Sequence, residues 1–126
     1  MTPAPHLLFV NSRSTLVPAA TWKKFYTEEH LANLIDTGTS KTAALYEEFD
    51  IPGPPGTENP RKFLAIYQTE VAEPLYSPNA KKLTPTSEIL SEGGKHTNVN
   101  IEHMDGDTRN YELIQTFDPN GVGEGI

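Results

Sequence analysis

The residues best suited to chemistry lie in one short stretch of this 126-residue chain, residues 21–31, which combines three aromatic side chains with a histidine. On a helix, at about 100° per residue, Trp22, Tyr26 and His30 climb one flank, and Leu34 continues it. A histidine titrates near neutral pH without help from burial, so His30 could carry protons for a substrate held against these rings. The commoner explanation of such spacing is a hydrogen-bonded structural histidine at a helix edge.

The other histidines are His6, His96 and His103. If His6 faces the helix layer, it could approach His30 or a ligand from the start of the first predicted strand. An exposed position before that strand fits the sequence equally well. His96 and His103 fall in an irregular stretch, where surface histidines are common.

Aromatic side chains outside the helix could complete a pocket around His30. Tyrosine hydroxyls can hold carbonyl or phenolic oxygens, and Asn11 could polarise a carbonyl. Core packing explains at least some of the rings as well. The candidates for one substrate cavity are Trp22, Phe25, Tyr26, Tyr46, Phe63, Tyr67 and Tyr111, together with Asn11.

Several classes of site are not supported by the sequence. The chain has no cysteine, which excludes disulfides, thiolate nucleophiles, zinc–thiolate sites and iron–sulfur clusters. A metal site from His103, Asp105 and Asp107, with or without Glu102, matches no recognised ligand spacing, and Asp105-Gly106-Asp107 is more typical of a polar turn. There is no Gly-x-Ser-x-Gly nucleophile elbow, and the glycines of residues 121–125 do not precede a helix. We therefore expect no metal site and no phosphate- or nucleotide-binding site.

The charge and length of the chain restrict its partners. A formal charge of −7 without a basic cluster argues against nucleic acid and against an anionic membrane surface. The first residues lack the pattern of a signal peptide, and no segment approaches the ~20 apolar residues of a membrane span. We expect one cytoplasmic domain over residues 1–126, with mobile tails at residues 1–5 and 120–126.

The secondary-structure pattern supplies the frame for these residues. Proline and glycine contents exclude regular structure in residues 51–60, and alternation in residues 62–68 puts Phe63, Ala65 and Tyr67 on one strand face. In chain order, the predicted elements are a strand over 6–12 buried on both faces, a helix from Pro18 to Thr37 stopped by Gly38, strands over 40–50 and 62–68, a short helix over 77–83, a single turn over 87–90 and a strand over 109–118. This βαββαβ order predicts a ferredoxin-like α+β fold, an antiparallel sheet with helices on one face.

Two segments carry a resemblance to a known family. The stretch from Phe25 to His30, following Leu8-Phe9-Val10-Asn11, resembles the first helix of the EthD-like family of the dimeric α+β barrel superfamily, which shows an aromatic pair, acidic residues and then histidine. The stretch from Asp107 to Pro119 is similar to the last strand of fungal members. The resemblance extends from about residue 6 to residue 119 and is weakest between residues 84 and 104.

The resemblance implies a homodimer whose two sheets pack into a barrel, with a pocket between sheet and helices in each subunit. Family members act without metal or organic cofactor as cyclases, dehydratases, decarboxylases or isomerases, several of them on polyketides in fungal secondary metabolism. By this resemblance His30 matches a recurring acid/base residue, and His6 matches a histidine at the start of the first strand of some polyketide cyclases.

The resulting hypothesis is a cofactor-independent lyase, isomerase or cyclase that acts on a polyketide-like or other oxygenated aromatic metabolite. His30 would be the acid/base, with Tyr26 and His6 as further catalytic candidates. The alternative is a non-catalytic dimeric barrel that binds a small ligand or serves in a stress response. A haem-degrading member of the superfamily is a third and weaker alternative.

Overall fold

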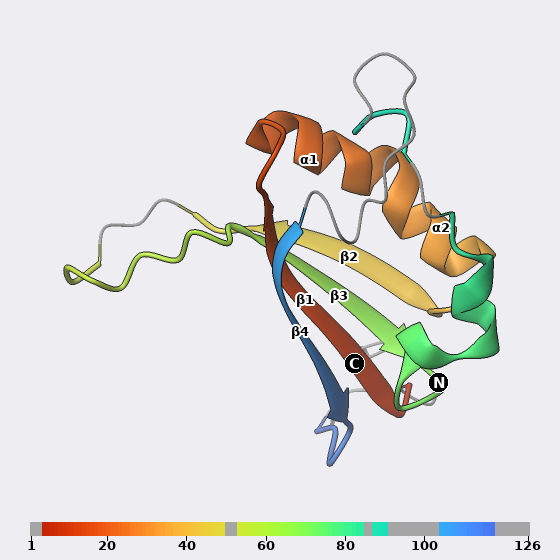
Figure 1. Cartoon of the computed structure of the whole chain (residues 1–126). Helices are drawn as coiled ribbons and strands as arrows, with labels where there is room; N and C mark the ends of the chain where they lie inside the picture. The colour runs from red at the N-terminus through yellow and green to blue at the C-terminus, as the bar shows by residue number, and fades with distance from the viewer. Residues whose placement is uncertain (1–3, 50–52, 85–86, 91–103, 118–126) are drawn as a thin grey trace.

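A four-stranded antiparallel sheet forms the base of the computed structural model, which describes residues 4–49, 53–84, 87–90 and 104–117. The strand order is β2-β3-β1-β4, and every neighbouring pair is antiparallel. This arrangement confirms the predicted α+β class and is compatible with a ferredoxin-like fold (Figure 1). The strands are β1 (His6–Ser14), β2 (Thr42–Glu47), β3 (Phe63–Thr69) and β4 (Met104–Glu112).

One long helical segment lies over one face of the sheet (Figure 1). It consists of α1 (Ala19–Phe25), a π-helical turn η1 (Tyr26–His30) and α2 (Leu31–Asp36), so the predicted helix is confirmed except for its π-turn. Pro18 precedes the first turn, and its carbonyl accepts the backbone N–H groups of residues 21 and 22. Gly38 ends the helix with φ of +76°, the left-handed conformation that glycine adopts without strain.

The core lies between this helix and the sheet. On β3 the predicted alternation is confirmed, because Phe63, Ala65 and Tyr67 are buried against the helix. On β1 the same face carries Leu8, Val10 and Ser12, whereas the residues between them are only half-buried. The prediction that β1 is buried on both faces is therefore wrong. Within the described residues, the helical layer covers only one face of the sheet.

The other face of the sheet, here called the open face, is apolar at its centre. An antiparallel sheet face that meets water normally carries polar side chains at these alternate positions. Tyr46 is 58% exposed and Tyr111 is 45% exposed on this face. Its apolar side chains are Leu7, Phe9, Ala44, Tyr46, Leu64, Ile66 and Tyr111.

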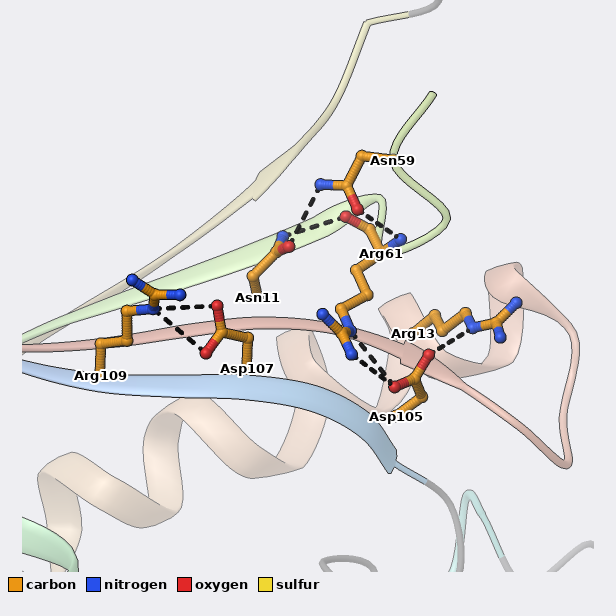
Figure 2. Close-up of polar contacts among 7 residues, drawn as sticks. All are labelled: Asn11, Arg13, Asn59, Arg61, Asp105, Asp107 and Arg109. Atoms are coloured by element: carbon orange, nitrogen blue, oxygen red, sulfur yellow. Dashed lines mark hydrogen bonds and ion pairs between the residues drawn. The ribbon is translucent and has the colours of Figure 1, made fainter. Parts of the chain in front are cut away.

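One end of the open face is polar (Figure 2). Asp105 accepts a hydrogen bond from Arg13 Nε at 2.8 Å and is also bound by Arg61, whose Nη2 lies 3.0 Å from Oδ1. These two guanidinium groups, Arg13 first, hold the pKa of the Asp105 carboxyl below its usual value. Arg109 pairs with Asp107 at 3.0 Å on the same strand.

The segment after β3 forms tight helical turns instead of the predicted short α-helix. Residues Pro74–Tyr76 form the 3-10 turn η2 and Pro78–Lys82 form the 3-10 turn η3. Ser77 caps η3 as predicted, because its hydroxyl accepts the Ala80 N–H at 3.4 Å. The predicted turn over residues 87–90 is present at residues 88–90.

The last strand lies further toward the N-terminus than predicted. It begins at Met104 and ends at Glu112, whereas alternation in the sequence predicts a strand over 109–118. Its partner β1 begins at His6, which pairs with Glu112, so no β1 residue remains to pair beyond Leu113. Asp105-Gly106-Asp107 therefore lies in a strand, and the prediction of a polar turn there is wrong.

Two further predicted regions lie at the borders of the described chain. The described residues of the predicted proline-rich loop, 53–60, are without helix or strand and extend away from the sheet, as predicted (Figure 1). The predicted tail at residues 120–126 and most of that at residues 1–5 lie outside the described residues.

Candidate active site

A cavity of about 790 Å³ lies between the helical segment and the sheet. Its size is within the range of small-molecule sites in proteins. The helical layer contributes aromatic rings and a histidine, the sheet contributes a tyrosine, and η2, η3 and the residues after them form one wall. Its lining residues are Leu8, Val10, Trp22, Phe25, Tyr26, His30, Leu34, Tyr67, Leu75, Tyr76, Ala80, Leu83, Thr84, Met104 and Thr108.

The π-helical turn places the ring of His30 in this cavity. The Leu31 N–H donates to the Tyr26 carbonyl, five residues earlier, in place of the four-residue spacing of an α-helix. His30 stacks on Phe25 with the ring centroids 5.1 Å apart, and it meets the Tyr26 ring edge-on at the same distance. The wider turn thus packs the imidazole against two consecutive aromatic residues.

Burial keeps His30 neutral. The aromatic surroundings withhold water from an imidazolium, and this lowers the pKa of His30 to about 4. Within the described residues, the cavity lining contains no carboxylate that would offset this effect. At neutral pH the imidazole is therefore uncharged and can accept a proton.

A buried polar chain runs from the helix into the sheet. The Trp22 Nε1–H donates to Ser12 Oγ at 3.2 Å, and Ser12 Oγ lies 3.4 Å from the Tyr26 hydroxyl. All three side chains are 1–2% exposed. Burial raises the pKa of Tyr26, and the hydrogen bond with Ser12 opposes that shift.

Tyr67 brings an unsatisfied hydroxyl to the same cavity. Its oxygen is buried and has no hydrogen-bond partner in the described part of the chain. Burial, and after it the electrostatic effect of Tyr26, raise the pKa of Tyr67, so the hydroxyl stays protonated and can donate. A buried donor without a protein partner is unfavourable, and a ligand oxygen would satisfy it.

His30 also borders a smaller hollow of about 110 Å³ between the helical segment and Thr84. Phe25, His30 and Thr84 line both spaces. Glu29 and Asn33 complete the hollow. Asn33 fixes Thr84 by accepting its backbone N–H at 2.9 Å, and the Glu29 carboxylate accepts a hydrogen bond from Ser87.

The structure does not bring all the predicted residues into one cavity. His6, Tyr46 and Tyr111 line a different space, a groove of about 640 Å³ on the open face. His6 is the first residue of β1, where it pairs with Thr69 and Glu112, and it does not line the cavity of His30. The single cavity expected from the sequence is therefore divided between the two faces of the sheet, and Trp22, Phe25, Tyr26, His30 and Tyr67 share the helix side.

Asn11 and Phe63 both have structural roles, Asn11 in hydrogen bonds at the start of β3 and Phe63 in the core. The Asn11 amide donates to the Arg61 carbonyl at 3.0 Å and accepts from Asn59 at 3.2 Å (Figure 2). It also donates to the Phe63 carbonyl at 3.0 Å. These bonds hold the strand entry of β3 and leave no Asn11 donor for a substrate. Phe63 is 2% exposed in the core and is not part of the cavity lining.

Ser12, whose hydroxyl oxygen lies 3.4 Å from that of Tyr26, was not identified from the sequence. The alternation of Leu8, Val10 and Ser12 on β1 was the signal that places it on the helix face. Glu102 and His103, which were considered above as metal ligands and not supported, lie outside the described residues, as does His96. Among the described residues, no cluster of histidines and carboxylates could hold a metal ion.

The chain matches no protein-family model, and comparison with curated proteins and with solved structures gives no match. Among the described residues, no helix is long and apolar enough to span a membrane. The candidate site therefore rests on geometry: an aromatic cavity on the helix side of an α+β sheet, with a neutral histidine and buried hydroxyls in its wall.

Proposed function

We propose that the chain is a cofactor-independent enzyme that transfers a proton on an oxygenated aromatic or polyketide-like substrate in this cavity. The observation that carries the proposal is a neutral, half-buried His30 in one cavity with the unsatisfied hydroxyl of Tyr67. A base and a hydrogen-bond donor that face one small molecule are the minimum needed to remove a proton next to a carbonyl. Cyclisation, dehydration, decarboxylation and isomerisation all use this step.

The cavity walls support a flat, mostly apolar substrate. Trp22, Phe25 and Tyr26 pack on one another with centroids 5.3–5.5 Å apart, and all three line the cavity. Aromatic surface binds flat ring systems well, and the few hydroxyls supply orientation. These features agree with the resemblance to the EthD-like family. On the basis of that resemblance, we propose that the enzyme is a lyase or isomerase of secondary metabolism.

The low pKa of His30 limits the reactions that the site can support. An imidazolium in this cavity is unstable unless negative charge appears beside it. When a ketone loses a proton, the enolate oxygen carries that charge, and hydroxyl donors such as Tyr67 stabilise it. The imidazolium and the enolate form an ion pair in this low-dielectric site. The protonated state of His30 is therefore stable only while the enolate is present. His30 also lines the smaller hollow at Glu29, and we propose that the imidazole exchanges protons with solvent there.

Exchange of ketone α-protons in D2O tests the proposal without knowledge of the natural substrate. Acetophenone and larger acetyl-substituted naphthols are incubated with the protein, and proton loss is followed by NMR. Wild type should accelerate exchange, and His30→Ala should reduce this acceleration a hundredfold or more, within the range of positioned acid–base catalysis of about 10²–10⁴. Added imidazole should restore part of the rate in His30→Ala. Equal rates in wild type and His30→Ala would refute the catalytic role.

A specific observation favours the alternative of a non-catalytic binding protein. The His30 imidazole has ring contacts but, among the described residues, no hydrogen-bond partner to orient it. Catalytic histidines are commonly held by a hydrogen bond on the second ring nitrogen. Protection of the ketones in thermal denaturation without any α-proton exchange would support binding alone.

We further propose that the chain is a homodimer that pairs through the open face. The chain as a whole has a charge of −7, which disfavours self-association, but the polar end of this face has arginines and aspartates together. A two-fold symmetric contact must be self-complementary, and a face with both signs and an apolar centre meets that condition. Exposed Tyr46 and Tyr111 would be buried by the second copy.

Sedimentation equilibrium tests the dimer. Ile66→Lys places a charge at the centre of the open face, and Lys24→Glu on the exposed side of α1 is the control for a change of charge. We expect wild type and the control to sediment as dimers and Ile66→Lys as a folded monomer. A wild-type monomer, with the face covered by its own residues 118–126 or left open, would refute the dimer but leave the His30 proposal untouched.

A further inference from the structure

Ser12 occupies a position in which its single hydrogen can be assigned by chemistry. Its Oγ has two neighbours among the described residues, the Trp22 indole N–H at 3.2 Å and the Tyr26 hydroxyl at 3.4 Å. An indole N–H is a donor only, so Ser12 must accept from Trp22. Ser12 is 1% exposed, and its own hydrogen therefore has no access to bulk water.

The Tyr26 oxygen is the acceptor that remains for the Ser12 hydrogen. If Tyr26 instead donated to Ser12, the serine oxygen would receive two hydrogen bonds, and its own hydrogen would be without a partner at a residue that does not line the cavity. In the other direction the hydrogen without a protein partner belongs to Tyr26, which does line the cavity. Buried donors without partners are rare because their desolvation is not repaid. The favoured arrangement is a directed chain from Trp22 through Ser12 to the Tyr26 oxygen.

This direction leaves the Tyr26 hydrogen without a protein acceptor. Tyr26 lines the cavity, and among the described residues its hydroxyl has no hydrogen-bond partner other than Ser12. The Tyr26 hydrogen then has no acceptor among these residues, and the buried hydroxyl of Tyr67, which lines the same cavity, also lacks a partner. Two phenolic donors in the wall of one cavity match the two lone pairs of a carbonyl or enolate oxygen.

We propose that Ser12 is a positioning residue that turns the Tyr26 hydroxyl toward the ligand, so that Tyr26 and Tyr67 together bind one carbonyl or enolate oxygen. This inference rests on the proposed function for the identity of the ligand but not for the direction of the hydrogen bonds. It assigns to Ser12 and Trp22 a role in substrate orientation, although neither touches the ligand oxygen. The favoured substrates are those whose ring system carries a ketone or an enolisable carbonyl.

The direction of the Ser12 hydrogen bond can be measured without any ligand. The protein is produced with 3-fluorotyrosine, the Tyr26 signal is assigned with Tyr26→Phe, and its pKa is followed by fluorine NMR. A hydrogen bond donated to the Tyr26 oxygen stabilises the phenolate, so Ser12→Ala should raise the pKa of Tyr26 by about 0.5, the scale of one hydrogen bond. Ser12→Cys, a poorer donor of nearly the same shape, should also raise it.

The opposite direction predicts the opposite sign. If Tyr26 donates to Ser12, the bond stabilises the neutral phenol, and Ser12→Ala would lower the pKa of Tyr26; a lowered or unchanged value overturns the proposal. Ser40→Ala is the matched control, because Ser40 is also a buried serine, its hydroxyl has no partner among the described residues, and it is not part of the cavity lining. This control should leave the Tyr26 pKa at its wild-type value.

The effect on the ligand is read from the carbonyl stretch of bound acetophenone in infrared difference spectra. Hydrogen bonds from Tyr26 and Tyr67 lower this frequency, and Ser12→Ala should reduce the shift by as much as Tyr26→Phe does. A full wild-type shift in Ser12→Ala would overturn the positioning role. Failure of acetophenone to bind wild type would instead count against the proposed function, and the fluorine titration would still decide the hydrogen-bond direction.

Discussion

The His30 imidazole lies almost parallel to the ring of Phe25, five positions earlier, with the centroids 5.1 Å apart and 27° between the planes. On a regular α-helix, residues five apart point about 140° away from each other, and their rings do not meet. The π-helical turn from Tyr26 to His30 widens the helix and brings both Phe25 and Tyr26 against the imidazole. The stack thus depends on backbone hydrogen bonding as well as on side-chain size.

The first prediction concerns pH and stability. The pKa of His30 is about 4 in the folded protein and about 6.5 in an unfolded chain, so only the unfolded state binds this proton between those values. Its contribution to stability is complete above pH 6.5 and is lost as the pH falls toward 4. The difference between these two pKa values corresponds to about 3 kcal/mol in the free energy of unfolding. Urea unfolding of wild type at pH 7 and pH 4 measures the loss.

His30→Phe is the comparison for this experiment, because it keeps a ring against Phe25 and has no group to titrate. Its free energy of unfolding should fall less than that of wild type over the same pH interval. All other groups titrate in both proteins, so the difference isolates His30. Parallel pH profiles would show that the imidazole is hydrated in the folded protein.

The second prediction separates stability from binding at Tyr67. Its buried hydroxyl has no partner among the described residues, so Tyr67→Phe should leave the free energy of unfolding unchanged or raise it by up to about 1 kcal/mol. The same change should weaken acetophenone binding. Tyr26→Phe is the matched comparison: it removes the contact with Ser12 and should lower stability by about 1 kcal/mol. A clear loss of stability in Tyr67→Phe would reveal a protein partner for its hydroxyl.

The third prediction concerns the end of the helix. Gly38 and Gly56 both have positive φ, +76° and +85°. A Cβ at Gly38 would lie 3.1 Å from the Asn79 side-chain nitrogen, which donates to the Gly38 carbonyl, whereas a Cβ at Gly56 meets nothing within 4 Å. Each alanine loses about 1 kcal/mol through the backbone conformation alone. Chemical denaturation should show a larger loss for Gly38→Ala, and equal losses would mean that Asn79 moves aside freely.

The sequence was sufficient to predict an element where its local pattern of residues had a single interpretation. The alternation of Phe63, Ala65 and Tyr67 predicted the buried face of β3, and the stop at Gly38 predicted the helix end. The last strand was misplaced because the alternation continues to Phe117, whereas the strand ends where β1 supplies no further partner. Such boundaries depend on pairing between segments that are distant in the sequence, and the local pattern of residues carries no information about that pairing.

The candidate site was predicted in part for a similar reason. The helix spacing and the β3 alternation placed His30 and Tyr67 on one side of the sheet. On β2, both alternate sets of residues are apolar, so the sequence did not show that Tyr46 faces away from the helix. The π-turn was not predicted either, because residues Tyr26–His30 carry no glycine or proline that would mark an irregular turn.

The π-turn has a consequence for how this site could arise and be lost. A π-turn is what one extra residue produces when a helix absorbs it without breaking. Everything after it is rotated by about 100° relative to everything before it, while the sheet beneath is untouched. Deletion of Thr27, an exposed residue within the turn, would restore a regular helix and carry the histidine out of its aromatic stack. We therefore expect a single codon gained or lost to decide whether this fold has an imidazole in its cavity.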